Sequence, residues 1–150
     1  MNLPTLELMK DHPNACLPYR AHDTDVGYDI FAIEIFKKIS DKITLYDTGI
    51  IVKPPNGYYV EIVARSSLSK SGYMIANSVG IIDPDYRGSL KIALIKVDET
   101  MPDLELPFCK CQIILRKLES FDIKSVSTLD ETERGTGGFG STDKNSVQTN

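Results

Sequence analysis

The chain has 150 residues, 41% of them hydrophobic, and a formal net charge of -4 at pH 7. That length suits one domain around a single hydrophobic core. The negative charge gives no basic field for nucleic acid, no apolar run reaches the roughly 18–20 residues of a membrane span, and no signal-type leader opens the sequence. Three cysteines are poor material for disulfides. We therefore expect a soluble intracellular protein, cytoplasmic or nuclear, with neither nucleic acid nor a membrane as a partner.

Short runs rich in β-branched and aromatic residues recur along the chain, separated by glycine, proline, asparagine and aspartate. Residues 1–19 contain three prolines and predict an irregular edge strand and loop. No comparable window has a helical stripe, apart from the short piece after Arg65. This succession predicts an all-β sandwich or closed barrel. The predicted strands are residues 43–46, 48–53, 58–64, 75–82, 90–97, 104–108, 112–115 and 121–126, and Asn56-Gly57 between two of them is a hairpin signal.

Three acidic residues surround Gly27, and the last of them, Asp29, opens strand-like sequence. Asp23 and Asp25 are predicted to be solvated loop residues. Because Mg²⁺ usually keeps several of its waters, the Asp29 carboxylate could hold the water shell of this cation. The spacing alone leaves open that Asp29 is one more solvated acid.

Arg65, Ser66 and Ser67 stand at a transition from a predicted strand to a short helix or turn. Free backbone N–H groups at such a transition bind anions, and the guanidinium adds a planar fork of donors. An N-cap serine beside a surface arginine explains the same residues equally well. The sequence therefore predicts either a phosphate site or a plain helix start.

Residues 80–88 place two aspartates and a tyrosine around Pro84, between two apolar runs. Asp-Pro followed by glycine is turn chemistry, so we predict that the two runs pair as a hairpin that turns at Pro84. In that register Asn77 lies opposite Lys91, and Asp83 lies where the apolar backbone ends. Taken alone, the turn could be only a solvated connection.

The last stretch is too glycine-rich to be core. Residues 135–140 formally match G-x-G-x-x-G, but the dinucleotide fingerprint also needs a preceding strand, a following helix and an acid further on. The stretch instead predicts a flexible arm that closes over a phosphorylated base with the Arg134 guanidinium, the Phe139 ring and the hydroxyls of Ser141 and Thr142. A plain disordered tail is the alternative.

Five ordered segments of the chain resemble the five motifs of the homotrimeric deoxyuridine triphosphatases, the dUTPases. The resemblance extends over residues 21–142, and the third and fifth segments are the most specific. The segments are Gly27-Tyr28-Asp29-Ile30, Arg65-Ser66-Ser67-Leu68, residues 77–88, Gln112-Ile113-Ile114-Leu115 and residues 134–142.

The resemblance implies a jelly-roll-like β-barrel over residues 1–130, three copies of which form a homotrimer with active sites at the subunit interfaces. Residues 131–142 would be the flexible C-terminal arm that reaches over a neighbour's site, followed by a polar disordered tail from 143 to 150. The implied activity is Mg²⁺-dependent hydrolysis of dUTP to dUMP and pyrophosphate. This reaction limits uracil incorporation into DNA and supplies dUMP for dTMP synthesis.

The resemblance also implies roles for single residues. Asp83 would be the general base that orients and deprotonates the attacking water, and Asp29 would anchor the outer-shell waters of Mg²⁺. Uracil and deoxyribose contacts are implied for Asn77, Ile81, Ile82, Tyr86, Lys91 and Phe139, and phosphate contacts for Arg65, Ser66, Ser67, Gln112, Arg134, Ser141 and Thr142.

The predicted hairpin also explains the choice of base. The backbone of Ile81 and Ile82 would offer the donor and acceptor pattern of uracil, and cytosine would leave a buried N–H unpaired, at a cost of about 1–3 kcal/mol. A thymine methyl would overlap atoms of a tight pocket. Tyr86 packed under the sugar would leave no room for a 2′-hydroxyl.

Two segments depart from the family pattern. Ala64 stands where a proline usually precedes the arginine of the second motif, and Pro107-Phe108-Cys109 stands where Gly-Asp-Arg precedes Gln112. Loss of that Asp-Arg pair could alter the trimer interface or the affinity for phosphate. Two other interpretations are a dCTP deaminase-like enzyme of the same fold, which relies on a glutamate in its site, and a dUTP-binding regulatory or sensor protein.

Overall fold

The strands of this protein are short, and every pair of them is antiparallel. The computed structural model describes residues 2–143, and over that range it holds ten strands and one 3-10 helix. In chain order the elements are β1 (Glu7–Lys10), β2 (Tyr28–Ala32), β3 (Glu34–Lys38), β4 (Ile43–Asp47), β5 (Ile50–Lys53), β6 (Tyr58–Ala64), η1 (Ser66–Lys70), β7 (Tyr73–Ile75), β8 (Gly80–Ile82), β9 (Lys91–Lys96) and β10 (Phe108–Lys117).

The chain divides into two units, Met1–Glu119 and Ser120–Asn150. All ten strands belong to the first unit, and the glycine-rich segment belongs to the second. The boundary predicted at residue 130 separates the strand domain from an arm that would close an active site, and this boundary stays a prediction. The predicted tail from residue 144 onward lies outside the described residues.

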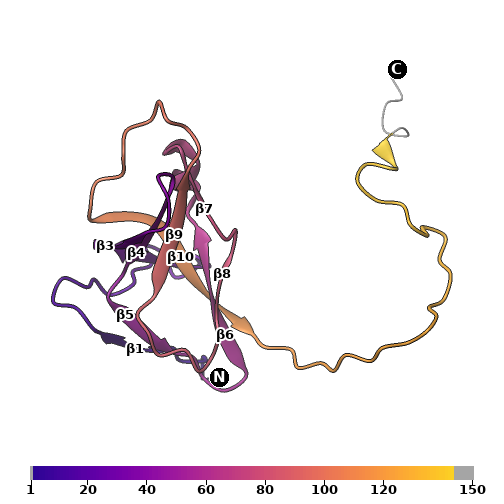
Figure 1. Ribbon diagram of the computed structural model, residues 1–150. Helices are drawn as coiled ribbons and strands as arrows, with labels where there is room; N and C mark the ends of the chain where they lie inside the picture. The colour runs from indigo at the N-terminus through magenta and orange to yellow at the C-terminus, as the bar shows by residue number, and fades with distance from the viewer. Residues whose placement is uncertain (1, 144–150) are drawn as a thin grey trace. The chain divides into compact units, whose positions relative to one another are not determined.

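Two four-stranded sheets make up the first unit (Figure 1). One has the order β2-β10-β6-β8 and the other β3-β4-β9-β7, and β1 pairs separately with β5. Apart from β3 and β4, which pair with each other, strands that follow one another in the chain lie in different sheets. The expected all-β, jelly-roll-like fold is confirmed, with separate sheets in place of a closed barrel.

The hydrophobic core follows from the alternation of side chains along the strands. In β9, Ile92 and Leu94 are 1% and 0% exposed, and Ile62 of β6 is 2% exposed. The rings of Tyr46 in β4 and Phe108 in β10 meet edge to face with centroids 4.9 Å apart. Such an aromatic pair adds about 0.5–1.5 kcal/mol beyond its buried area, and this one joins the two sheets.

Local sequence predicted some strands well and others not. β6 has the bounds predicted for residues 58–64, because its β-branched and aromatic residues stand between strong turn signals. The strands predicted at 104–108 and 121–126 are wrong. β10 begins only at Phe108, after Pro107, which has no N–H to donate to a ladder. Residues 121–126 have no strand partner within the described part of the chain.

The antiparallel pairing predicted between residues 75–82 and 90–97 forms only in part: Ile75 of β7 is opposite Leu94 of β9, and the N–H of Ala76 donates to the Ala93 carbonyl at 2.9 Å. β8 pairs with β6, whereas β9 lies in the other sheet between β4 and β7. The register predicted for this pair is wrong by one residue, since Ile75 is opposite Leu94, and on its other side β9 places Lys91 opposite Asp47 of β4. The pairing is partial because a turn at Ser78, whose φ is 64°, breaks the predicted strand into two strands of different sheets.

Asn56-Gly57 turns the chain without forming a hairpin. Gly57 has a φ of 80°, a conformation that favours glycine, and the N–H of Tyr58 donates to the carbonyl of Pro55 at 3.2 Å. The strands on either side of this turn, β5 and β6, lie in different sheets. The turn was predicted correctly, and the hairpin pairing was not.

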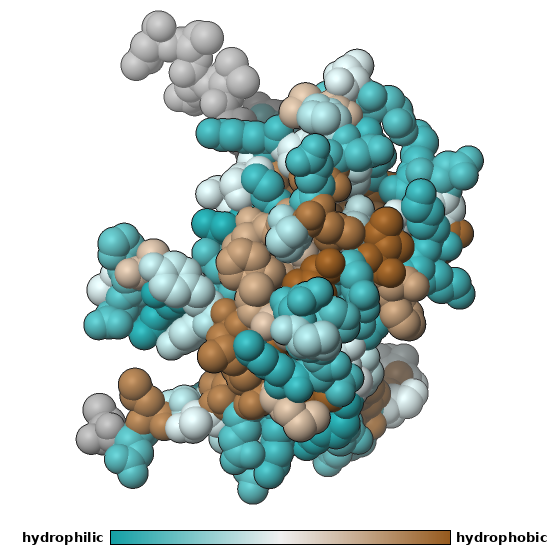
Figure 2. All heavy atoms as spheres, turned by 90° about the vertical axis from the view of Figure 1, so that its left-hand side faces the viewer, coloured by the Kyte–Doolittle hydropathy of each residue, from teal (hydrophilic) through white to brown (hydrophobic). Residues whose placement is uncertain are grey.

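Apolar side chains also gather on the surface. β1 and β3 lie on the side of the molecule that faces the viewer in Figure 2, where apolar atoms form a band between hydrophilic ones. The large apolar residues exposed on these strands are Leu8, Met9, Ile35 and Phe36. No helix within residues 2–143 has the length and apolarity needed to cross a membrane.

Candidate active site

Asp29, Arg65 and Gln112 meet on the sheet that contains β2, β10 and β6. Asp29 of β2 is directly opposite Gln112 of β10, and Arg65 follows the last residue of β6. Arg65 Nε lies 3.0 Å from Asp29 Oδ1, and Gln112 Nε2 donates to the carbonyl of Ala64 at 3.0 Å. The fold thus brings together the first, second and fourth motif segments.

The Arg65 guanidinium is also held by Cys109. Arg65 Nη1 donates to the Cys109 carbonyl at 2.9 Å and lies 3.3 Å from its Sγ. Burial raises the pKa of the Cys109 thiol, and the positive charge of Arg65 only partly opposes that shift. The thiol is therefore neutral near pH 7, and Asp29 is the carboxylate that the structure gives Arg65 as a partner. A fixed, half-exposed guanidinium of this kind is suited to an anionic oxygen.

The two serines lie on η1, which Leu68 anchors to the core at 2% exposure. The N-cap position is Arg65 and no side chain caps the helix, so the N-cap serine alternative is wrong. Ser66 is exposed, and the Ser67 hydroxyl oxygen is buried with no hydrogen-bond partner in the described part of the chain. A buried polar group without a partner costs about 1–3 kcal/mol, which a ligand oxygen would relieve.

The segment between β8 and β9 carries Asp83 and Tyr86. The Asp83 carbonyl accepts the N–H of Tyr86 at 3.1 Å, which closes a turn. Within residues 2–143 the exposed Asp83 carboxylate has no hydrogen-bond or ion-pair partner. The Tyr86 hydroxyl donates to the Ser89 carbonyl at 3.1 Å. Its ring lies so close to Gly88 that a Cβ there would be 2.6 Å from Tyr86 Cζ, which explains the glycine.

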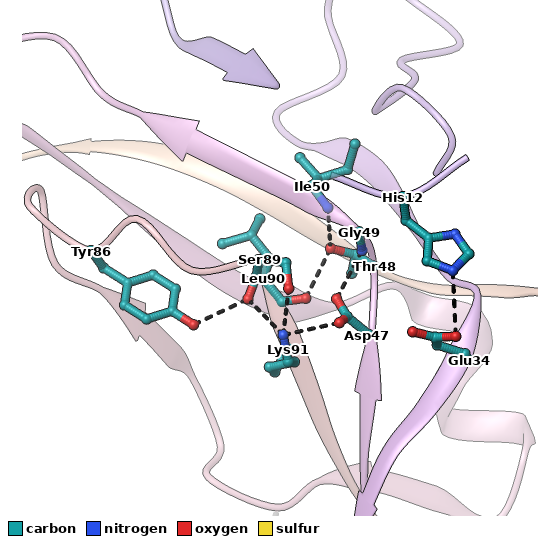
Figure 3. Close-up of polar contacts among 10 residues, drawn as sticks. All are labelled: His12, Glu34, Asp47, Thr48, Gly49, Ile50, Tyr86, Ser89, Leu90 and Lys91. Carbon is teal, nitrogen blue, oxygen red and sulfur yellow. Dashed lines mark hydrogen bonds and ion pairs between the residues drawn. The ribbon is translucent and has the colours of Figure 1, made fainter. Parts of the chain in front are cut away.

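No hydrogen bond or ion pair joins Lys91 to Asn77 within residues 2–143. Lys91 Nζ lies 3.0 Å from Asp47 Oδ2 (Figure 3). It also lies 4.5 Å from the centroid of the Phe36 ring. Asn77 is exposed in the turn before β8, where its carbonyl accepts the N–H of Val79 at 2.7 Å. The substrate roles of both residues stay predictions, without the register that linked them.

Ile81 and Ile82 lie on the edge strand of their sheet. Within residues 2–143, β8 has β6 as its neighbour on one side and no strand on the other. An edge strand presents N–H and C=O groups that the ladder does not use. The backbone of β8 therefore has groups available to a ligand. They are available because β8 is an edge strand, and not because of the hairpin that the sequence predicted.

The site can hold Mg²⁺ in one way. No group of three or more His, Cys, Asp or Glu side chains that could hold a metal ion occurs in residues 2–143. At Asp29 the donor is a single carboxylate, and one of its oxygens faces Arg65. A single carboxylate fits an outer-shell contact, because Mg²⁺ is commonly bound by one or two carboxylates together with waters and substrate phosphates.

The second unit contains Arg134, Phe139, Ser141 and Thr142. Arg134 Nε donates to the Gly137 carbonyl at 3.0 Å, within a series of tight turns. Phe139 is fully exposed and has a positive φ of 50°. The contact of these four residues with the groups of the first unit stays a prediction.

An apolar cavity of ≈ 550 Å³ lies on the other face of β2 and β10. Tyr28 and Ile113 line it, and because side chains alternate along a strand they point away from Asp29 and Gln112. None of the residues predicted to react or bind substrate lines this cavity. The candidate active site is therefore the charged face.

A jelly-roll-like fold that gathers an arginine, a glutamine and a buried serine hydroxyl at one end of β6, and carries a free carboxylate on the connection after β8 at the opposite end of β6, has the groups of a hydrolase acting on phosphate esters or anhydrides. The family model for dUTPase matches residues 14–143. The chain belongs to the dUTPase family.

Curated relatives agree with this assignment. A protein of Picosynechococcus sp. is 37% identical over 138 residues, which cover 91% of this chain and 97% of that protein. A protein of Corynebacterium diphtheriae is 40% identical over 135 residues, which cover 89% of each chain. Both are named deoxyuridine 5′-triphosphate nucleotidohydrolase.

Solved structures give the same fold. A variant of the dUTPase of Staphylococcus bacteriophage 80alpha, bound to dUpNHpp, matches with a TM-score of 0.73 at 25% identity and covers 91% of this chain and 97% of its own. A variant dUTPase of the S. aureus phage phi11, described with a structural Mg(II) ion, has a TM-score of 0.68 and covers 85% of this chain and 99% of its own. Its 23% identity supports the fold alone.

Three contacts near the site were not predicted from the sequence. Cys109 contacts Arg65, Asp47 pairs with Lys91, and Gly27 makes room for the side chain of Gln112. Contacts between residues so far apart in the chain leave no local signal. The glycine beside Asp29 was the one visible sign, because a missing side chain often marks a close approach.

Proposed function

We propose that this member of the dUTPase family hydrolyses dUTP to dUMP and pyrophosphate, with Asp83 as the general base. The observation that carries the proposal is the exposed Asp83 carboxylate, which has no partner within residues 2–143 and directly follows the open edge of β8. A general base must lie within one hydrogen bond of the water it activates, so it must not be occupied by an ion pair.

In this mechanism Asp83 orients a water and takes its proton as the water oxygen forms a bond to the α-phosphorus. The bond between the α-phosphorus and the α,β-bridging oxygen breaks, and pyrophosphate leaves with that oxygen. Proton abstraction by a positioned carboxylate typically contributes about 10²–10⁴-fold to the rate. Phosphoryl transfer of this kind otherwise depends on positioning and charge neutralisation.

Arg65, Gln112 and the Ser67 hydroxyl supply the donors for the phosphates. Arg65 is oriented by Asp29 and Cys109 through its Nε and Nη1. Asp29 would hold the water shell of Mg²⁺, and when bound this cation neutralises charge on the triphosphate. The buried Ser67 hydroxyl would gain the partner it lacks.

Uracil is recognised by the open edge of β8. The main-chain groups of Ile81 and Ile82 that are not used by β6 offer a fixed set of donors and acceptors. Asn77, in the turn before β8, lies next to this edge along the chain. A base with the wrong pattern would leave a desolvated N–H unpaired, at a cost of about 1–3 kcal/mol.

We further propose a homotrimer in which the arm of one subunit completes the site of another. Arg134 would contact the γ-phosphate, Phe139 would stack on uracil, and Ser141 and Thr142 would donate to phosphates. The fully exposed Phe139 ring and the exposed apolar residues of β1 and β3 support association, because large apolar groups in water favour burial.

The activity is tested by incubating the full chain with Mg²⁺ and, in turn, dUTP, dCTP, UTP and dTTP. Pyrophosphate released from dUTP alone supports the proposal, and ammonia from dCTP or no turnover would overturn it. Asp83→Asn should lower kcat by about 10²–10⁴-fold with little change in the unfolding midpoint. Turnover by this variant within tenfold of the unmodified chain would remove Asp83 from the role of base.

Arm exchange is tested by complementation. Asp83→Asn leaves the arm intact, and a chain truncated before Arg134 keeps Asp83. Each should be inactive alone, and unfolding and refolding them together should restore activity, because some sites then receive an intact base and an intact arm from different subunits. A mixture as inactive as its components would show that each arm serves its own subunit.

A further inference from the structure

A partly buried ion pair lies behind the segment that carries Tyr86. Asp47 of β4 and Lys91 of β9 are directly opposite in the ladder, and their side chains are only 15% and 22% exposed. Lys91 Nζ lies 3.0 Å from Asp47 Oδ2 and 4.5 Å from the centroid of the Phe36 ring. The ammonium group is therefore fixed by β4 and β3, and Figure 3 shows its contact with Asp47 of β4.

Lys91 and Tyr86 share one acceptor. The Ser89 carbonyl accepts the Tyr86 hydroxyl at 3.1 Å and Lys91 Nζ at 3.3 Å, and Lys91 Nζ also bonds the Ser89 hydroxyl. Asp47 in turn accepts the N–H of Gly49 at 2.8 Å. Burial alone would raise the pKa of Asp47, but its hydrogen bonds with Gly49, Ser89 and Lys91 outweigh burial and lower it. The Asp47 carboxylate is thus charged near neutral pH.

The position of the Tyr86 ring depends on this acceptor. One face of the ring lies against the backbone at Gly88, where an added Cβ would be 2.6 Å from Tyr86 Cζ. The hydroxyl end is held by the Ser89 carbonyl, and 41% of the tyrosine remains exposed. The hydrogen bond from the Tyr86 hydroxyl to the Ser89 carbonyl therefore fixes the orientation of this partly exposed ring.

We propose that Asp47 and Lys91 are positioning residues that set the preference for deoxyribose over ribose. Asp47 fixes Lys91, Lys91 fixes the Ser89 carbonyl, and that carbonyl fixes the ring of Tyr86. The inference rests on the proposed function, in which Tyr86 packs under the sugar and excludes a 2′-hydroxyl. A ring free to tilt would admit the ribose substrate.

The same strand offers a matched control. Lys96, also in β9, lies 2.6 Å from Asp103, and that carboxylate accepts the hydroxyl of Tyr73 at 3.2 Å. This second set has the same three groups, a lysine, an aspartate and a tyrosine hydroxyl, without contact to Tyr86 or its carbonyl acceptor. It separates the effect of losing a lysine–aspartate pair from the effect on the sugar site.

The experiment compares Asp47→Asn, Tyr86→Phe and Asp103→Asn in the full chain with Mg²⁺. For each, kcat and KM are measured with dUTP and with UTP, together with the urea unfolding midpoint. Asp47→Asn and Tyr86→Phe should each lower the ratio of kcat/KM for dUTP to that for UTP by about threefold to tenfold, the effect of one hydrogen bond. Because both act through one ring, the double variant should fall no further than the lower single variant.

Asp103→Asn should leave the ratio within twofold even if its unfolding midpoint drops, and Asp47→Glu, which keeps the charge, should recover part of the ratio. If the unmodified chain hydrolyses dUTP and the ratio is unchanged in Asp47→Asn, the inference is overturned and the proposed function is not. Equal changes in Asp47→Asn and Asp103→Asn would also overturn it, because the effect would then be one of general stability.

If Asp47→Asn fails to fold, Tyr86→Phe decides: it loses only a hydroxyl, and an unchanged ratio there overturns the inference. No turnover of dUTP by the unmodified chain would overturn the proposed function and the inference together.

Discussion

Gly27→Ala is the substitution that most sharply tests how the motif segments are assembled. A Cβ at this position would lie 2.9 Å from Gln112 Cδ and even closer to its amide oxygen. The Gln112 side chain is the only part that has to move, so it would swing away from the Ala64 carbonyl that it binds at 3.0 Å. The substitution therefore displaces the Gln112 side chain, a proposed phosphate donor, while residue 112 remains glutamine.

The expected effects on stability and activity differ in size. The lost neutral hydrogen bond costs about 0.5–1.5 kcal/mol, and replacing glycine by alanine recovers about 0.4–1 kcal/mol through the unfolded chain, because Gly27 does not need a positive φ. The free energy of unfolding should therefore change by less than about 1 kcal/mol. A hydrogen bond to a charged phosphate contributes about 1.5–3 kcal/mol, so KM for dUTP should rise about 10- to 100-fold.

The assay is a double-mutant cycle of Gly27→Ala and Gln112→Ala, with steady-state kinetics on dUTP and urea denaturation for all four proteins. If the alanine acts only by displacing Gln112, the double variant should have the KM of Gln112→Ala alone. Two results would refute the reasoning. One is a KM for Gly27→Ala within twofold of the unmodified chain, and the other is independent, multiplicative effects of the two substitutions.

Three further predictions concern the core, acid stability and the thiols. Leu94→Ala, at a fully buried position of β9, should lower the free energy of unfolding by about 2–5 kcal/mol in urea titrations, and a loss below about 1 kcal/mol would contradict its place in the core. The pKa of Asp47 is lower in the folded chain than its ordinary value of 3.8, so its stabilisation is complete above that value and is lost as the pH falls through the lower folded pKa. The difference in unfolding free energy between the unmodified chain and Asp47→Asn should therefore shrink below about pH 4, and a difference that grew in acid would be inconsistent. Burial raises the pKa of Cys111 to about 12, so a thiol reagent at pH 8 should label exposed Cys16 and spare Cys111 until the chain is denatured, as mass spectrometry can show; equal labelling rates would disagree.

The fold class could be predicted because its signals are local. β6 is dense in β-branched and aromatic residues and bounded by turn residues, so its limits follow from the sequence alone. Pairing could not be predicted in the same way. Residues 75–82 are rich in apolar residues and were predicted as one strand, yet a turn at Ser78, with a positive φ, divides them between two sheets. Sheet partners depend on contacts between distant segments, and residues 121–126 have strand-like alternation but no partner among residues 2–143.

The candidate site shows the same division. Asp29, Arg65 and Gln112 were predicted to act on phosphates and a cation, and the fold brings them together. The groups that orient them were not predicted. Cys109 lies against Arg65 only because β10 runs beside β6, and Asp47 meets Lys91 only because β4 pairs with β9. Side chains that support a site depend on strand register, and register was the weakest part of the prediction.

The segment that carries Asp83 is attached at its two ends to different layers, since β8 belongs to one sheet and β9 to the other. If the layers slide against each other, the separation of those ends changes, and so does the position of the carboxylate. Turnover in this protein would therefore depend on the mechanical stiffness of the packing between sheets, to which the Tyr46–Phe108 ring pair contributes. A core substitution that loosens this packing would lower kcat even where the chain remains folded.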